Sequence, residues 1–251
     1  MIRLGDVHKA FGEKVVLAGL SLDVPDGMNT VIIGASGSGK SVTLKLIVGL
    51  LEPDAGRIEV DGLSVPDLDR DDLTQLRAHI GYVFQFAALF DSMTVAENIR
   101  LGLAKRGLDE DTIRARIEHS LATVELSGQE DRYPAELSGG MRKRVGIARA
   151  VALEPRYILY DEPTTGLDPV TSAVMNRLMQ RTRDLGVTGV IVTHDMRSAF
   201  TVGDRIGMLH DGVIRQVGTV AEIQATTDPV VRQFIEGRPD DVELPARRSA
   251  S

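Results

Sequence analysis

The run GASGSGKS at residues 34–41 constrains the fold of this chain more than any other feature. It fits the pattern G-x-x-x-x-G-K-[ST], with an apolar strand-like run at residues 30–33 before it and an amphipathic segment after it. Backbone N–H groups converge on phosphate only where no Cβ atoms crowd the turn, and a following helix adds the positive end of its dipole. The sequence therefore predicts a strand, a phosphate-binding loop and a helix, with a merely flexible glycine-rich turn as the alternative.

Two side chains of this loop have expected contacts with a bound nucleotide. Lys40 is expected to reach the β- and γ-phosphates, and the Ser41 hydroxyl is expected to bind Mg²⁺. A loop of this kind alone leaves kinases, GTPases, motors and transport ATPases open. A second motif is needed to decide among them.

Short β-rich runs alternate with amphipathic helices through most of the chain. This pattern favours an α/β fold with a mainly parallel sheet and helices packed on it. Further strand-like runs are residues 57–60, 157–160, 190–192, 206–209 and 213–217. The expected helix faces are Ile113, Ile117, Leu121 and Val124 after Asp109, and Val170, Val174 and Leu178 before a stop at Gly186. Residues 240–251 lose this periodicity, so we expect a frayed tail there.

Composition excludes several classes of protein. The chain has 251 residues, enough for one large or two-lobed domain, and its formal net charge of −7 argues against binding nucleic acid. With no Trp it is also short of platforms for stacking single-stranded bases. The absence of Cys rules out disulfides and thiolate metal sites, and no apolar run approaches the ~20 residues of a membrane span. We expect a soluble protein that acts at a membrane only through a partner.

The second motif is LSGGM at residues 137–141. It precedes a segment whose apolar residues recur at helical spacing, which places Ser138 as a helix N-cap with free N–H groups beside it. A cap without further function is the alternative. Two helix N-termini suited to phosphate in one chain, in this order, favour a functional interpretation.

At these motifs the sequence resembles the ATP-binding subunit of ABC transporters, and the resemblance covers nearly the whole chain. Walker A matches residues 34–41, and the LSGGQ signature matches residues 137–141 with Met141 in place of the final Gln. The further matches are Walker B at residues 157–162, the Q-loop glutamine at Gln85, the D-loop at residues 166–168 and the switch histidine at His194.

The resemblance implies a fold and a division into domains. The implied fold is the P-loop NTPase fold of the ABC ATPase type, with a mainly parallel core sheet, an N-terminal antiparallel β part and an α-helical subdomain. The ATPase domain would cover residues 1–239, with the helical subdomain inserted at about residues 86–152, and residues 240–251 would be the tail.

The resemblance also assigns roles to individual residues. Two adjacent buried carboxylates are costly unless a cation or a reaction requires them, and by resemblance Asp161 would hold Mg²⁺ while Glu162 acts as general base. His194 would touch the γ-phosphate, and Gln85 would contact the metal and link its site to the helical lobe. The implied contacts with ATP are Phe11, which would stack on adenine, and Gly34, Ser36, Gly37, Gly39, Lys40, Ser41, Val42, Ser138, Gly139, Gly140 and Asp168. The alternatives are a core position for Phe11, a polar strand end for Gln85 and a structural histidine at 194.

Partners follow from the same resemblance. In this family Ser138 and Gly140 of one subunit would complete the nucleotide site of another, so the chain needs a second ATPase copy, most simply itself. It would also need an integral-membrane permease, which docks beside the Q-loop. No nucleic acid partner is expected.

Local matches point to one branch of the family. Residues 86–99, which include an A-L-F-D-S element, and residues 234–240 are similar to Mla/Mce-type lipid transporters, as is Met141. This implies phospholipid transport from the cytoplasmic face of a bacterial inner membrane, with Mce-domain and small accessory subunits as further partners. Because residues 1–12 carry no transit-like leader, we expect a bacterial rather than a chloroplast protein.

Other functions fit less well. An ABC importer of a small solute such as an amino acid is the main alternative. ABC ATPases of DNA repair carry a long coiled coil between the phosphate loop and the signature motif, whereas this chain has no sustained heptad between Lys40 and Ser138. Translation-type members carry two cassettes in one chain, whereas this chain has one. A P-loop kinase would have no use for residues 137–141. From Phe234 onward the chain is expected either to clasp the neighbouring subunit or to be a disordered end.

Overall fold

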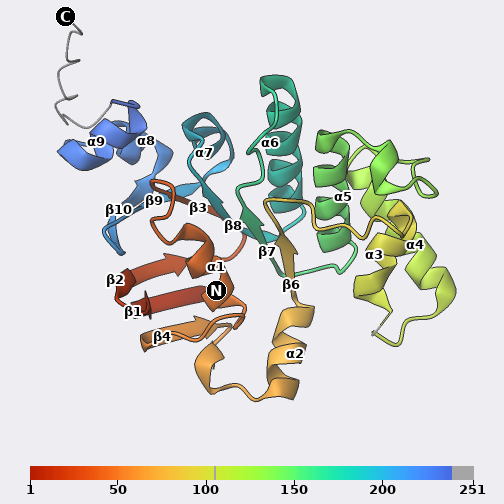
Figure 1. The fold of residues 1–251 in the computed structure, drawn as a ribbon, viewed down its shortest axis with the longest axis horizontal. Coiled ribbons are helices and arrows are strands. Elements are labelled where there is room, and N and C mark those ends of the chain that lie inside the picture. The colour runs from red at the N-terminus through yellow and green to blue at the C-terminus, as the bar shows by residue number, and fades with distance from the viewer. Residues whose placement is uncertain (105, 239–251) are drawn as a thin grey trace, which may run out of the picture.

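The computed structural model describes residues 1–104 and 106–238, which form two β-sheets with helices packed around them (Figure 1). The expected tail at residues 240–251 lies outside the described residues, as do the last residues of the 234–240 match. Within the described part, no helix is long and apolar enough to cross a bilayer.

The larger sheet has six strands in the order β10, β9, β3, β8, β7, β6. Their bounds are, in that order, Val213–Thr219, Arg205–His210, Asn29–Ile33, Thr188–Thr193, Tyr157–Asp161 and Ile80–Val83. All neighbours are parallel except β9 and β10, which are antiparallel. The central strands β3, β8 and β7 are buried throughout, and this explains their nearly continuous runs of β-branched and aromatic residues.

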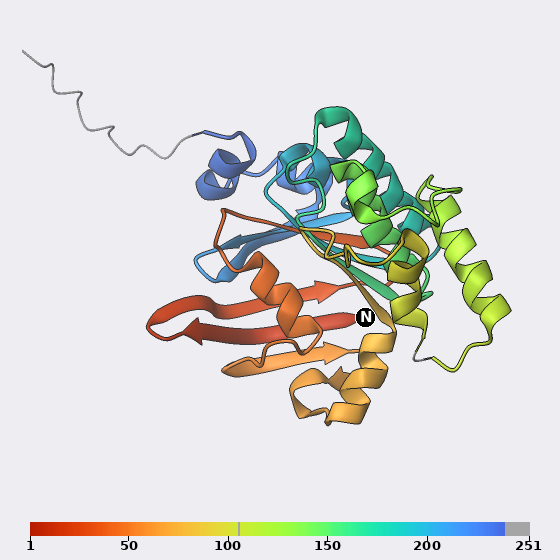
Figure 2. The same ribbon diagram turned by 45° about the vertical axis from the view of Figure 1, so that its right-hand side comes forward.

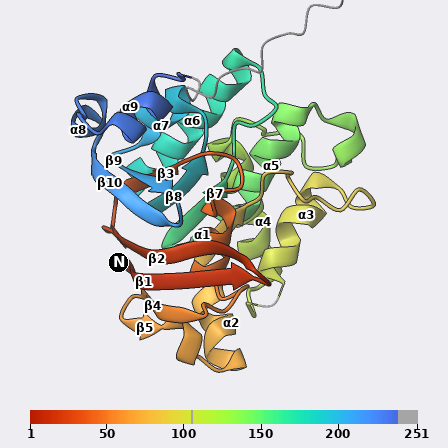
Figure 3. The same cartoon turned by 60° about the vertical axis from the view of Figure 1, so that its left-hand side comes forward.

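The smaller sheet is antiparallel, in the order β2, β1, β4, β5. Its strands are Lys14–Val24, Ile2–Phe11, Ala55–Val60 and Leu63–Ser64, respectively. Asp61 and Gly62 join β4 to β5 with φ angles of 54° and 82°, as a tight hairpin turn requires. Helix α1 (Lys40–Ile47) lies between the two sheets (Figure 2, Figure 3).

The remaining helices differ in the core that they join: the first shares the core of α1, and the others pack on the opposite face of the larger sheet or at its ends. They are α2 (Arg70–Ala78), α3 (Val95–Leu103), α4 (Glu110–Thr123), α5 (Gly139–Val151), α6 (Pro169–Asp184), α7 (Met196–Val202), α8 (Val220–Gln224) and α9 (Pro229–Ile235). Short 3₁₀ turns span Val65–Asp67 and Pro134–Glu136. Helices α3, α4 and α5 lie together on one side, yellow to green in Figure 1, and connect β6 to β7 along the chain. That they form a separate subdomain at about residues 86–152 stays a prediction.

Alternate residues of the central strands face two hydrophobic cores. Val31 and Ile33 of β3 pack with helices α3 to α7, whereas Ile32 between them packs with α1 and the smaller sheet. The period of two follows from the geometry of a strand. The α/β class, the mainly parallel core sheet and the N-terminal antiparallel part are thus confirmed.

One predicted helix face needs correction. Val170 was expected on the buried face of α6, but 75% of it is exposed; the buried face is Met175, Leu178 and Met179. Val170 lies in the first turn, just after the N-cap Asp168, where the helix has not yet reached the sheet's core. Helix α1 ends at Ile47, before a positive φ of 63° at Gly49, because glycine in that conformation stops a helix.

The parallel arrangement sets where a site can form. Strands β3, β8, β7 and β6 are consecutive neighbours and point the same way, so the segments after them emerge at one edge of the sheet. In open α/β sheets, ligands bind at the carboxyl ends of the strands. Residues 34–41, Gln85, Glu162 and His194 all follow these ends.

Candidate functional site

A cleft of about 390 Å³ opens at this edge. Its lining residues are Phe11, Lys14, Val16, Ser36, Gly37, Gly39, Lys40, Ser41, Val42, Gln85, Glu162 and His194. The structure thus brings most of the sequence-predicted site residues to one cleft, although they come from five separate stretches of the chain. Of the other predicted residues, Gly34 and Asp161 adjoin the cleft through their contacts, whereas Ser138, Gly139, Gly140 and Asp168 do not line it.

The phosphate loop depends on glycine at two positions. A Cβ atom at Gly34 would lie 2.5 Å from the backbone oxygen of Leu209, and one at Gly39 would lie 2.9 Å from Val16. Their φ angles of 157° and 107° are also unfavourable for other residues. The backbone of the loop therefore requires glycine at both positions where the sequence has it.

Lys40 is buried beneath this loop, with 5% of its side chain exposed. Its ammonium donates hydrogen bonds to the backbone oxygens of Gly34 (2.8 Å) and Ala35 (3.0 Å) and lies 3.4 Å from Glu162 Oε1. Within the described residues, the buried Ser38 hydroxyl has no hydrogen-bond partner. A phosphate oxygen at this loop would supply an acceptor for both groups, so the loop fits a nucleotide phosphate. The sequence prediction did not single out Ser38 among the loop residues.

A short hydrogen-bonded chain leads from α1 to β7 and β6. Ser41 Oγ donates to Asp161 Oδ1 (2.6 Å), and the Tyr82 hydroxyl donates to Asp161 Oδ2 (3.1 Å). Burial, reinforced by the charge of Asp161, raises the pKa of Tyr82. The sequence analysis missed Tyr82; its only signal was a position on the strand before Gln85.

Hydroxyl and carboxylate oxygens side by side are a donor set that suits Mg²⁺. Within residues 1–104 and 106–238, no group of three or more His, Cys, Asp and Glu side chains could hold a metal on its own. Mg²⁺ usually takes one or two carboxylates and completes its shell with water and substrate phosphates. Ser41 and Asp161 therefore fit such an ion.

Glu162 is held in an uncommon backbone conformation. Its φ of 48° is positive, which costs a residue other than glycine about 1–2 kcal/mol. Its Oε2 accepts a hydrogen bond from the Thr165 hydroxyl (3.1 Å) and lies 2.9 Å from His194 Nδ1. Only 10% of the Glu162 side chain is exposed, against 50% for His194. The carboxylate is thus fixed at the cleft, while the imidazole can face a ligand.

Phe11 lies at the end of β1 on the rim of the cleft. It is 48% exposed, which excludes the alternative of a core position. Lys9 Nζ lies 5.6 Å from its ring centroid. The ring is available for stacking, and its contact with adenine stays a prediction.

The signature segment, residues 137–141, begins helix α5 as predicted. Ser138 is the N-cap, and its Oγ accepts a hydrogen bond from the Met141 N–H (3.2 Å). Ser138 and Gly139 are exposed, whereas Gly140 is packed so closely that an added Cβ would lie 2.4 Å from Thr171 Cγ2. The N-terminus of α5 therefore faces solvent, away from the chain's own cleft, and rests on the first turn of α6.

Asp168 caps helix α6 rather than lining the cleft. One carboxylate oxygen accepts hydrogen bonds from the N–H groups of Val170 (2.9 Å) and Thr171 (3.0 Å), and the other accepts one from the Thr171 hydroxyl (2.5 Å). The Thr171 bonds lower the pKa of Asp168. Its expected contact with ATP stays a prediction.

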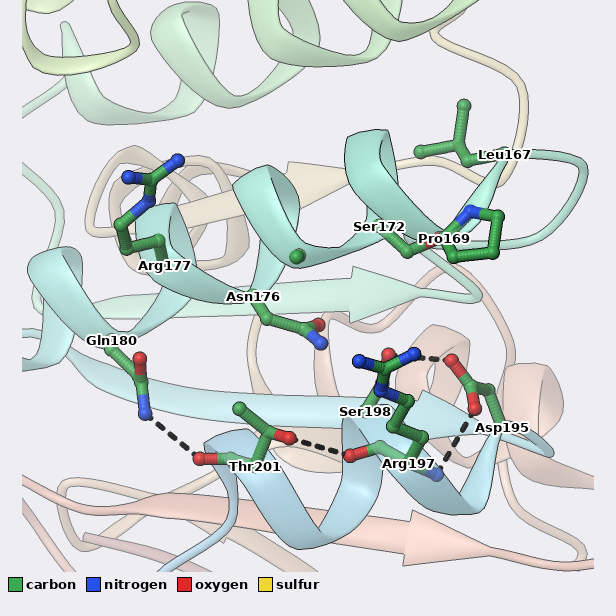
Figure 4. Close-up of a pocket in the computed structure, with 11 residues that line it drawn as sticks. Leu167, Pro169, Ser172, Asn176, Arg177, Gln180, Asp195, Arg197, Ser198 and Thr201 are labelled. Carbon is green, nitrogen blue, oxygen red and sulfur yellow. Dashed lines mark hydrogen bonds between the residues drawn. The ribbon is translucent and has the colours of Figure 1, made fainter.

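A second cleft of about 350 Å³ lies between α6 and α7 (Figure 4). It reaches from Leu167 to Thr201, and the Asn176 side chain points into the space between the helices. Within the described residues, the Asn176 Oδ1 atom is buried without a hydrogen-bond partner. This cleft holds none of the predicted catalytic residues, although Asp195 follows His194.

Comparisons with known proteins identify the family of this chain. A family model described as ABC transporter matches residues 17–165. The probable ribonucleotide transport ATP-binding protein mkl of Mycobacterium leprae is 39% identical over 239 residues, 94% of this chain and 69% of that protein. Protein TRIGALACTOSYLDIACYLGLYCEROL 3, chloroplastic, of Arabidopsis thaliana is 40% identical over 259 residues. This match covers 96% of this chain and 74% of the Arabidopsis protein.

Among solved structures, the chain is similar to a dimeric ATP-binding cassette in a post-hydrolysis state bound to ADP and Pi. The TM-score is 0.79 at 36% identity, and the match covers 88% of this chain and 99% of the other. This likeness covers most of the chain and confirms the predicted fold type.

Proposed function

Because the chain belongs to the ABC transporter family and is an ATP-binding, ATP-hydrolysing subunit of that kind, we propose that the cleft around Lys40 carries the hydrolysis reaction. The observation that supports this most is the convergence of Lys40, Ser41 and Glu162 on one cleft from the ends of neighbouring parallel strands. Cation, hydroxyl and carboxylate are the groups that phosphoryl transfer to water requires.

In the proposed mechanism, phosphate replaces interactions that the protein now makes with itself. The Lys40 ammonium turns from the oxygens of Gly34 and Ala35 to the β- and γ-phosphates of ATP. Glu162 accepts the proton of the attacking water, with its carboxylate held by Thr165. His194, next to that carboxylate, would contact the γ-phosphate.

We propose that Ser41 and Asp161 would hold Mg²⁺, with Gln85 as a further ligand. The ion would stabilise the negative charge that develops on the phosphate oxygens. Tyr82 keeps the second oxygen of Asp161 engaged, so that the first, which accepts from Ser41 in this structure, would be the one to turn to the ion or its water. Tyr82 is therefore part of the proposed metal site, although it is not a ligand.

A Tyr82→Phe substitution tests this arrangement. The affinity for Mg²⁺ in the presence of ATP is expected to fall about tenfold, because a hydrogen bond to a charged group contributes about 1.5–3 kcal/mol. Mn²⁺ binding followed by electron paramagnetic resonance measures this without turnover. The matched control is Tyr160→Phe on the neighbouring strand β7. It removes a buried hydroxyl that is hydrogen-bonded to Thr182 of α6. An equal loss in both variants would contradict a role at the metal.

We also propose that two copies of this chain form the working unit. Ser138 and Gly139 are exposed and do not line the chain's own cleft, so they are free to meet the nucleotide of a second copy. The N-terminus of α5 offers unpaired N–H groups and a positive dipole end to a phosphate. The dimeric state of the similar cassette with ADP and Pi supports this proposal.

For the substrate, we propose phospholipid, moved with a membrane permease from the cytoplasmic face of a bacterial inner membrane. Residues 86–99, which include the A-L-F-D-S element, support this, and Phe86 and Phe90 of this stretch are 79% and 56% exposed, as in a docking segment. The similarity to an Arabidopsis protein whose name contains that of a galactolipid points the same way. Mce-domain and accessory subunits are part of this proposal.

Import of a small solute is the second candidate. It is favoured by the 39% identity to a protein named for ribonucleotide transport. Both candidates use the same ATPase cleft and differ only in the permease.

Co-purification from membranes decides between them. Full-length protein, extracted with its permease, is expected to bring an Mce-domain subunit and bound phospholipid that mass spectrometry detects. A permease accompanied by a soluble receptor for amino acids or nucleotides would contradict the lipid assignment. Phe86→Ser is expected to lose the permease while keeping ATP binding, whereas Leu185→Ser, which alters a similarly exposed apolar residue, is the control.

A further inference from the structure

Lys143 of helix α5 holds the turn that begins at Glu162. Its ammonium donates hydrogen bonds to the backbone oxygens of Thr165 (2.6 Å) and Pro163 (3.1 Å). Burial lowers the pKa of Lys143, and the negative charge of Glu162 partly offsets this. The sequence analysis did not single out this residue, because its partners are backbone oxygens, which no side-chain pattern marks, and they lie about 20 residues away along the chain.

The turn that Lys143 holds is directly connected to the Glu162 carboxylate. Thr165 accepts from Lys143 through its carbonyl and donates through its hydroxyl to Glu162 Oε2 (3.1 Å). The Thr165 N–H also donates to the Glu162 backbone oxygen (3.3 Å). Because Glu162 has a positive φ, its carboxylate points into the cleft only while this turn keeps its shape.

The same helix presents Ser138 at its N-terminus, five residues before Lys143. Close contact between Gly140 and Thr171 joins this end of α5 to α6 as well. A displacement of the α5 N-terminus would therefore be carried to residues 163–165. We propose that Lys143 is a positioning residue that couples contact at Ser138 to the orientation of Glu162 through Thr165.

This inference rests on the proposed function, in which Ser138 binds the nucleotide of a second copy while Glu162 acts in the chain's own cleft. Lys143 would then make hydrolysis at one site depend on a nucleotide at the other. The two neighbouring cations cannot do this. Arg142 donates to the carbonyls of Pro134 and Leu137, and Arg144 donates to those of Val124 and Glu125, all within the helical region.

Lys143→Met tests the coupling, and Arg144→Met is the matched control, since it also removes two bonds to carbonyls from the same helix. Turnover is measured on the full chain with Mg-ATP, with the thermal unfolding midpoint recorded for each variant. In Lys143→Met we expect kcat to fall about tenfold, because small misplacements of a catalytic group are costly, while KM and the affinity for a fluorescent ATP analogue change less than twofold. Arg144→Met is expected to keep its kcat. An unchanged kcat in Lys143→Met, or an equal fall in both variants, overturns the inference.

A double-mutant cycle with Ser138→Ala separates coupling from general damage. If Lys143 transmits contact at Ser138, the double variant is expected to have nearly the kcat of the weaker single variant. Effects that multiply would show independent roles and overturn the inference. If Ser138→Ala alone leaves turnover unchanged, the proposed dimer site fails too, and the cycle distinguishes this from failure of Lys143 alone.

Discussion

A Glu162→Gln variant is expected to bind ATP normally, to form a stable dimer with it, and to lose hydrolysis by about 10²- to 10⁴-fold. Glutamine keeps the shape and the acceptor for Thr165, but it cannot take the proton of the attacking water. Without hydrolysis, the nucleotide that stabilises the closed dimer stays in place. Phosphate release measures the first effect, and light scattering with ATP measures the second.

The chain offers a close control for this variant. Glu125 also has a positive φ, 59°, but it is exposed and lies outside the cleft. Glu125→Gln should therefore retain the wild-type rate. Near-normal phosphate release from Glu162→Gln would remove Glu162 as the general base.

A Lys40→Ala variant is expected to weaken ATP binding by about 10- to 100-fold, since charge-assisted hydrogen bonds contribute about 1.5–3 kcal/mol. The substitution removes the buried cation that would contact two phosphates, and it also leaves Glu162 without its ion-pair partner 3.4 Å away. Equilibrium titration with a fluorescent ATP analogue gives the affinity directly.

Lys45 is the matched control, because it lies on the same helix α1 but is exposed at its far end. Lys45→Ala should bind ATP as the unchanged chain does. If both variants bind equally well, the phosphate-loop assignment of residues 34–41 is wrong.

Sequence alone predicted the parts of the site that depend on local backbone. At Gly34 and Gly39 a Cβ atom would collide with another segment of the chain. Ser138 is the N-cap residue at which helix α5 begins. Such requirements act within a few residues, so they leave a readable pattern. The spacing of these segments along the chain then allowed the family to be recognised.

The contacts that hold the catalytic groups could not be predicted in this way. Tyr82 meets Asp161 only because β6 pairs with β7 in one register, with Val83 opposite Tyr160. Lys143 meets Thr165 only because α5 packs beside the turn after β7. Neither Tyr82 nor Lys143 is part of a motif with fixed spacing, because tertiary packing determines which residue each of them contacts. The exposure of Val170 has the same explanation. Helical spacing predicts which face of α6 is apolar, but tertiary packing determines which turns of that face are buried.

The attachment of α3, α4 and α5 to the sheet has a mechanical consequence. Because β6 and β7 are parallel neighbours, the chain leaves β6 at the edge with the nucleotide cleft and enters β7 at the opposite edge. A load on these helices from a membrane protein would thus reach the sheet through two chain connections a strand's length apart, besides the packing of α5 on β6. Such a load would tend to rotate the three helices about the line that joins the two connections. Gln85 follows β6 at one of these connections, so a rotation of the helices would twist the backbone beside the nucleotide cleft.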